Sequence, residues 1–232
     1  MAQEAIRRSL VSDQVFRLLA EDVLCDRYAP GEKLPTQRRL AADLGVNMAS
    51  VREAVKRLEQ LGLVGVRHGD AMRVRDWRAD GGLDVVAHVL FRAGGLDRPT
   101  LEALLEARRL MLREAARLAA ERREDASRLV ELAERMAAGG SAEEAQQIDF
   151  AFFSELVEAA QNVVFVLILN SIRKLYFDRA ELFQPLVEDR DELAPLYVRA
   201  AAAVAAREPG AAAEAIEALS AEQERRLADA LG

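Results

Sequence analysis

The sequence predicts a mainly α-helical protein: an N-terminal winged helix-turn-helix domain with a small β-hairpin wing, then an antiparallel bundle of six or seven α-helices. Three observations lead to this fold class. Residues 31–64 show the period of two helices separated by a tight turn, residues 63–77 hold two short β-rich runs, and the pattern beyond residue 82 is helical. We therefore expect domains at residues 1–76 and 83–232, joined by a linker at 77–82.

The first of the two short helices is expected over residues 37–44. Pro35 cannot continue a helix from the preceding segment, so Thr36 is the expected N-cap. Gly45 suits the left-handed backbone of a sharp turn. Asn47 is then a good N-cap for the helix that follows.

The second helix, expected over residues 48–61, combines a buried apolar stripe with a polar and basic outer face. A capped helix with such a face suits the major groove of DNA. Taken alone, the pattern is also compatible with an ordinary helical hairpin whose charged face is solvated. The residues expected on the outer face are Asn47, Met48, Ser50, Arg52, Lys56 and Arg57.

Three strings carry a resemblance to a known family: GEKLPTQRRLAADLGV, VREAVKRLEQLGLV and RHGDAMRV. They resemble the DNA-binding domain of the GntR superfamily of bacterial transcription regulators, over roughly residues 11–74. The resemblance implies a homodimer that binds a double-stranded DNA operator, a short palindrome.

The resemblance also implies which residues contact DNA. Arg38, Arg52, His68 and Gly69 match family contact positions, and Thr36, Asn47 and Ser50 keep polar character at three more. Met48 departs from the pattern, because many relatives have an arginine there that reads a guanine. A methionine offers only apolar contact, for example to a thymine methyl, so we expect a different operator at that position.

Charge and composition agree with this interpretation. The whole chain carries a net charge of −7, but residues 38–75 hold eight basic and four acidic side chains. A local positive field beside an acidic second domain fits a regulator of specific sites. The sequence has no long apolar run, so we expect no membrane contact and a cytoplasmic protein.

The second domain is expected to be all-helical. Thr100, Ser141 and Asn162 are the expected starts of three of its helices. The expected helices cover about residues 83–93, 101–122, 125–138, 142–160, 163–183, 189–207 and 211–231.

Three segments of this domain, EARRLMLREAARLAAER, DFAFFSELVEAAQN and REPGAAAEAIEAL, resemble the ligand-sensing FCD domain of the FadR branch of the superfamily. Many members of that branch hold a divalent metal with an Asp and three His. Here Asp149 is kept, but Phe153, Tyr197 and Leu219 align with the three His positions. The chain has two histidines, His68 and His88, so we expect no metal site and no cofactor.

Most aromatic residues of the chain fall in these helices, which fits either a packed core or an apolar cavity. The segments GLDVVAHVLFRAG and NVVFVLILNSIRKLYFDRAELF resemble metal-free, fatty-acid-responsive members that bind acyl-CoA. The expected effector is therefore a small anion, either an acyl-CoA or another carboxylate. The residues expected to bind it are Arg108, Asp149, Phe153, Asn162, Asn170 and Tyr197.

Arg108 matches an arginine that faces the pocket in family relatives. It either meets the anionic group of a ligand or pairs with a carboxylate on a neighbouring helix. Asn162 and Asn170 are either pocket donors or helix caps, and Asp149 is a candidate for a buried hydrogen-bond acceptor.

These observations predict a sequence-specific DNA-binding regulator whose operator binding responds to a small anionic effector. The alternative is a regulator whose helical bundle only dimerises and binds no effector. We do not expect an enzyme, because the helical domain offers neither a Ser–His nor a Cys–His pair, nor a phosphate-binding loop.

Overall fold

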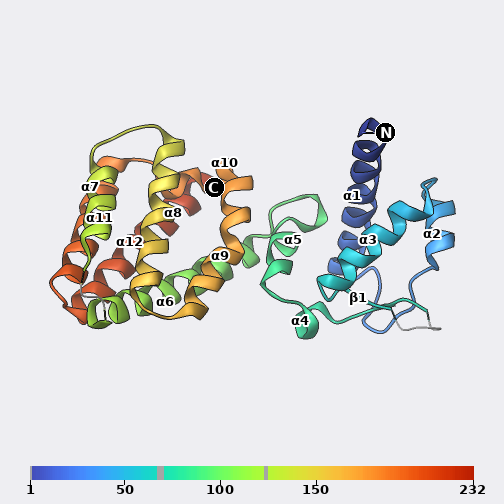
Figure 1. The fold of residues 1–232 in the computed structure, drawn as a ribbon, viewed down its shortest axis with the longest axis horizontal. Helices are drawn as coiled ribbons and strands as arrows, with labels where there is room; N and C mark the ends of the chain where they lie inside the picture. Colours follow the sequence, from blue (N-terminus) through green and yellow to red (C-terminus); the bar gives the residue numbers. More distant parts are fainter. Residues whose placement is uncertain (1, 67–70, 123–124) are drawn as a thin grey trace. The chain divides into compact units, whose positions relative to one another are not determined.

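The computed structural model describes residues 2–66, 71–122 and 125–232, with side chains from residue 11 onward in these ranges. It confirms the fold class, because the chain is mainly α-helical with a small antiparallel sheet (Figure 1). Contacts within the chain divide it into two compact units, residues 1–101 and 102–232. Of the described helices, none is long and apolar enough to cross a membrane.

The first unit is built on α1 (Ala2–Leu24), α2 (Gln37–Asp43) and α3 (Met48–Gln60). α1 packs against α3, and α2 also lies against α3. Their apolar stripes form one core, in which Phe16 and Leu58 are almost completely buried. This core fixes the orientation of α3 and of its outer face.

The turn between α2 and α3 forms as expected. The Thr36 side chain accepts a hydrogen bond from the backbone N–H of Arg39 at 3.2 Å, and the Asn47 side chain accepts one from Ser50 at 2.9 Å. Gly45 has a φ of 64°, in the left-handed region that favours glycine. Both predicted N-caps and the predicted turn are therefore confirmed.

The wing consists of β1 (Val64–Gly65) and β2 (Arg73–Val74), paired antiparallel. Val64 lies opposite Val74, and an isolated bridge between Lys33 and Arg73 extends the pairing toward the chain before α2. Residues 67–70, between the two strands in sequence, lie outside the described residues.

The segment that follows the wing differs from the expectation. The expected linker holds a short helix, α4 (Trp77–Asp80), and the helix expected over residues 83–93 is divided into η1 (Leu83–Val85), α5 (Val86–Leu90) and η2 (Arg92–Gly94). Val85 and Val89 belong to the same core as α1 and α3. Apolar packing therefore places residues 83–101 in the first unit, whereas the sequence analysis assigned them to the second domain.

The second unit contains the bundle, with seven α-helices in its described part (Figure 1). α11 packs against α7 and α12, α7 against α8, and α8 against α9. The elements are α6 (Arg98–Arg122), α7 (Ser127–Ala137), α8 (Ala142–Ala159), α9 (Val163–Asp178), α10 (Ala180–Phe183), η3 (Gln184–Leu186), α11 (Arg190–Ala205) and α12 (Pro209–Leu231).

Two helix boundaries in the bundle differ from the sequence analysis. α6 begins at Arg98, so Thr100 lies inside its first turn and is not the N-cap. Pro99 does not prevent this, because the first turn of a helix needs no intrahelical N–H donor. The helix expected over residues 163–183 breaks at Arg179, whose φ of −119° and ψ of 40° are not helical. The caps expected at Ser141 and Asn162 are confirmed.

Candidate functional site

The outer face of the helix-turn-helix carries a set of exposed cations. Arg38 on α2 and Arg52 and Lys56 on α3 are exposed, and none of them forms an ion pair with a described side chain. Arg39, in contrast, pairs with Asp43 on its own helix at 3.3 Å. The unpaired cations can therefore meet DNA phosphates or guanine edges without breaking an existing ion pair.

Ser50 does not lie on this outer face. Only 3% of its surface is exposed, because it precedes Ala54 by one helical turn and so shares the face of α3 that enters the core. Its hydroxyl has no hydrogen-bond partner among the described residues. The expected contact of Ser50 with DNA is corrected accordingly.

Arg57 was expected on the outer face, but it is only partly exposed because its side chain lies against α1. It forms an ion pair with Asp13 on α1, and its guanidinium carbon lies 4.1 Å from the centre of the Phe16 ring. Met48 is half-buried against the same core, which leaves part of its side chain for an apolar contact. The predicted contacts of His68 and Gly69 lie outside the described residues.

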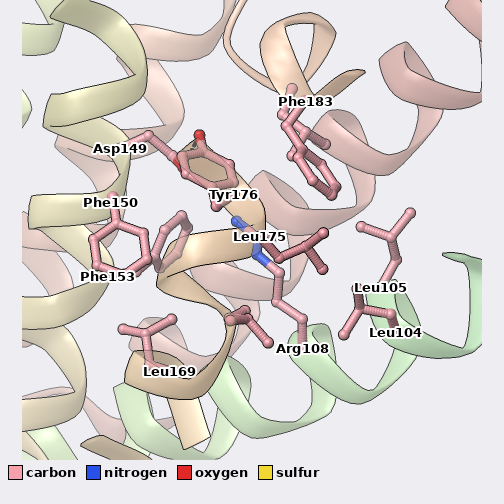
Figure 2. A pocket seen from close by; sticks show the side chains of 12 residues that line it. Leu104, Leu105, Arg108, Asp149, Phe150, Phe153, Leu169, Leu175, Tyr176 and Phe183 are labelled. Carbon is pink, nitrogen blue, oxygen red and sulfur yellow. Dashed lines mark hydrogen bonds between the residues drawn. The ribbon is translucent and has the colours of Figure 1, made fainter. Parts of the chain in front are cut away.

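A small cavity lies in the second unit, between α6, α8, α9, α10 and η3 (Figure 2). Its volume is about 40 Å³, which leaves room for a few water-sized groups. Leucine, isoleucine and phenylalanine side chains form most of its wall. Three polar residues line it: Arg108, Asp149 and Tyr176.

Asp149 is the centre of a buried hydrogen-bond network. Its side chain accepts the Tyr176 hydroxyl at 2.8 Å on Oδ2, and the Tyr197 hydroxyl at 2.5 Å and Gln223 Nε2 at 2.8 Å on Oδ1. These three donors come from α9, α11 and α12 and converge on α8. Only 2% of Asp149 is exposed. Hydrogen bonds from several donors offset the free-energy cost of burying its carboxyl group.

The two tyrosines act as neutral donors in this network. Burial raises the pKa of both Tyr176 and Tyr197 well above 10, and the adjacent charge of Asp149 adds to the effect. Both phenols therefore keep their protons at neutral pH and donate them to the carboxyl oxygens.

Arg108 is connected to this network through the side-chain amide of Gln223. Its Nη2 donates to Oε1 of Gln223 at 2.8 Å, and its guanidinium carbon lies 4.6 Å from the centre of the Phe153 ring. Figure 2 shows the side chain extending from α6 toward Tyr176. Nη1 is buried and has no partner among the described residues.

Arg108 therefore forms no ion pair with a carboxylate in the described part of the bundle, which was one of its two expected roles. Phe153, expected to bind the effector, lies beneath the guanidinium and lines the cavity. Tyr197 reaches Asp149 but is not part of the cavity wall. The cavity thus brings together Arg108, Asp149 and Phe153 from the predicted set.

The two asparagines of that set lie elsewhere. Asn162 caps α9, where its side chain accepts a hydrogen bond from Val164 N at 3.1 Å. Asn170 is exposed, because it follows the cavity-lining Leu169 and points about 100° away around the helix. Neither lines the cavity, so their expected placement in the pocket is corrected.

Gln223 was not among the predicted site residues, and Leu219 on the same helix was aligned with the third histidine position of family members. Leu219 is fully buried in the core, and Gln223, one helical turn later, is the residue of α12 that reaches Asp149. A signal was present in the sequence: Gln223 is a polar residue on the apolar stripe formed by Ile216, Leu219 and Leu227.

These residues do not fit the divalent metal that many members of the FadR branch hold. The oxygens of Asp149 already accept three hydrogen bonds, and the Tyr and Gln side chains point N–H and O–H groups at them. Phe153 offers an apolar ring where a nitrogen ligand would be needed. No cluster of three or more His, Cys, Asp or Glu gathers elsewhere among the side chains described within residues 11–66, 71–122 and 125–232.

Comparison with protein families gives two matches. Residues 11–74 match the model described as bacterial regulatory proteins, gntR family, and residues 103–222 match the FCD domain. Among curated proteins, the HTH-type transcriptional regulator Mce2R of Mycobacterium tuberculosis is 41% identical over 180 residues, which cover 76% of this chain and 74% of that protein.

A second relative is the fatty acid metabolism regulator protein of Proteus mirabilis. It is 27% identical over 158 residues, which cover 68% of this chain and 66% of that protein. Among solved structures, Lar, which controls expression of the Listeria monocytogenes agr system, is similar with a TM-score of 0.57. That match has 21% identity and covers 94% of this chain and 96% of the other, so it supports the fold alone.

Proposed function

The chain belongs to the GntR family of bacterial regulatory proteins and carries an FCD domain, and we propose that a small anionic effector, bound in this domain without a metal, controls its binding to DNA. The general function follows from the family: the protein is a DNA-binding transcription regulator with an effector-binding domain, and not an enzyme.

One observation carries the proposal of an anionic effector. The Nη1 group of Arg108 is buried beside the cavity and has no partner among the described residues. A buried donor of a charged group that lacks a partner costs free energy, about 1–3 kcal/mol or more. A carboxylate in the cavity removes this cost, because guanidinium and carboxylate form strong, charge-assisted hydrogen bonds.

The cavity size bears on the identity of the effector. Ligand sites for drug-sized molecules usually measure about 300–1,000 Å³, whereas this cavity measures about 40 Å³. A compact carboxylate needs modest side-chain movement, and an acyl chain needs the leucine and phenylalanine walls to separate. The relative named as a fatty acid metabolism regulator supports an acyl-CoA, so both classes belong in the test.

The alternative function of the second domain is dimerisation alone, without binding of an effector. The small volume of the cavity favours it. Dimerisation itself is part of both proposals, since two recognition helices are needed for a palindrome. The exposed apolar residues Val163, Val164 and Leu167 on α9, with exposed fractions of 69%, 55% and 61%, offer a surface for a second copy.

We propose the following mechanism. A homodimer in the cytoplasm presents two α3 helices to an operator, with Arg38, Arg52, Thr36 and Asn47 in contact with DNA. An effector that prefers one arrangement of the two units shifts the protein toward it, and operator affinity changes by the difference in effector affinity between the arrangements.

Thermal-shift measurements with short carboxylates and acyl-CoAs test the effector proposal. A ligand at one hundred times its Kd should stabilise the protein by about 2.7 kcal/mol. Arg108→Gln should remove this shift. Arg109→Gln is the matched control, because Arg109 is the next residue of α6 and pairs with Glu217 and Glu224 outside the cavity. Absence of any shift in the wild-type protein favours the dimerisation domain.

Selection of binding sites from random DNA tests the DNA face. We expect a short palindrome and no guanine preference opposite Met48. Recovery of the guanine that arginine-bearing relatives read would contradict the assignment of that position.

A further inference from the structure

Two opposite charges line the same cavity. Arg108 extends into it from α6 and Asp149 from α8, and the wall around them is largely apolar. In such surroundings a guanidinium and a carboxylate attract each other strongly and normally form a direct pair. The structure shows no such pair between them.

Gln223 lies between the two groups. Its Oε1 accepts from Arg108 at 2.8 Å, while its Nε2 donates to Asp149 at 2.8 Å and to the Tyr197 hydroxyl at 2.9 Å. Arg108 can only donate and Asp149 accepts, so the amide has one orientation that satisfies both. The residue is fully buried, which prevents the side chain from turning to solvent.

We propose that Gln223 is a neutral spacer that prevents Arg108 from pairing with Asp149 and so keeps Nη1 of Arg108 available to an anion. This inference rests on the proposed function, because it concerns how the effector site is kept open. Gln223 is a positioning residue, since it acts on the ligand only through Arg108.

The chemistry of the amide suits this role better than other side chains. A Glu at this position would pair with Arg108 directly and would place a second carboxyl group against Asp149. An Ala or Met would satisfy neither neighbour, and the guanidinium would then move onto Asp149. Glutamine alone among these supplies an acceptor to one side and a donor to the other while remaining uncharged.

The first experiment needs no ligand. It measures the coupling between Arg108 and Asp149 by a double-mutant cycle of Arg108→Met and Asp149→Asn, with urea unfolding of the full chain as the readout. We expect weak coupling when Gln223 is present. In a Gln223→Ala background we expect stronger coupling: the coupling constant between Arg108 and Asp149, obtained from the four unfolding equilibrium constants of the cycle, should be at least tenfold larger.

Gln223→Met, which keeps the volume but cannot bridge the two groups, gives the same result if Gln223→Ala does not fold. Ser220→Ala is the control background. Ser220 is fully buried on the same helix and its hydroxyl has no partner among the described residues, so its loss should leave the coupling unchanged. Equal coupling in the wild-type and Gln223→Ala backgrounds overturns the proposal.

The second experiment uses the carboxylate or acyl-CoA with the largest thermal shift. Gln223→Ala should weaken its binding at least tenfold, and adding Asp149→Asn should restore most of it, because the competing carboxylate is gone. A purely structural role for Gln223 predicts a further loss in the double variant. If no anion binds the wild-type protein, the proposed function fails, and the coupling experiment still decides the role of Gln223.

Discussion

Replacement of Tyr197 by Phe removes one oxygen atom and isolates its energetic role. The hydroxyl donates to Asp149 at 2.5 Å and accepts from Gln223 at 2.9 Å, and the residue is fully buried. Hydrogen bonds to charged groups contribute about 1.5–3 kcal/mol each. We expect Tyr197→Phe to lower the free energy of unfolding by about 2 kcal/mol, because the buried carboxylate of Asp149 loses one of its three donors.

Urea unfolding followed by far-ultraviolet circular dichroism measures this change. The matched control is Tyr28→Phe, because the hydroxyl of Tyr28 has no hydrogen-bond partner among the described residues. The control should change the free energy of unfolding by less than about 0.5 kcal/mol. If both variants lose the same amount, Asp149 does not depend on a phenolic donor and the network described above is wrong.

Four further outcomes are expected. Arg52→Ala should weaken operator binding, measured by fluorescence anisotropy, by about 1–3 kcal/mol without loss of stability. Arg57→Ala should instead lower the free energy of unfolding by about 1 kcal/mol, since its ion pair is half-exposed. Reversed effects of the two variants would contradict the faces assigned to these residues. Ser50→Ala should leave operator affinity within about twofold and not reduce stability, because its buried hydroxyl has no described partner; a large loss of affinity would restore Ser50 to the DNA face. The free energy of unfolding should fall as pH rises above about 10, because the folded protein holds the protons of Tyr176 and Tyr197 more tightly than the unfolded chain does. A free energy of unfolding that does not change with pH in this range would contradict the raised pKa values.

The helix-turn-helix could be predicted from sequence because its signals are local. Thr36 and Asn47 cap their helices through hydrogen bonds within three residues, and Gly45 marks the turn by its own backbone preference. The burial of Ser50 follows from its spacing of one helical turn from Ala54, whereas Arg57 was misplaced because its environment depends on how α1 packs on α3. That packing is tertiary, and the period of a single helix does not reveal it.

The cavity and the hydrogen-bond network of Asp149 were only partly predictable for the same reason. Arg108, Asp149 and Tyr197 could be identified from resemblance to family positions, but Gln223 reaches Asp149 from α12, 74 residues away in sequence. The boundary between the units lies after residue 101 and not at the expected linker, because Val85 and Val89 pack in the core of the first unit. Composition alone does not show this packing.

Operator binding with and without effector tests the central claim most directly. Anisotropy is measured on the selected operator with the wild-type protein, Arg108→Gln and Arg109→Gln, and with the anion that gives the largest thermal shift. We expect the anion to change operator affinity at least tenfold for the wild-type protein and for Arg109→Gln, and to leave Arg108→Gln unaffected. An equal response of all three proteins would contradict an effector site at Arg108.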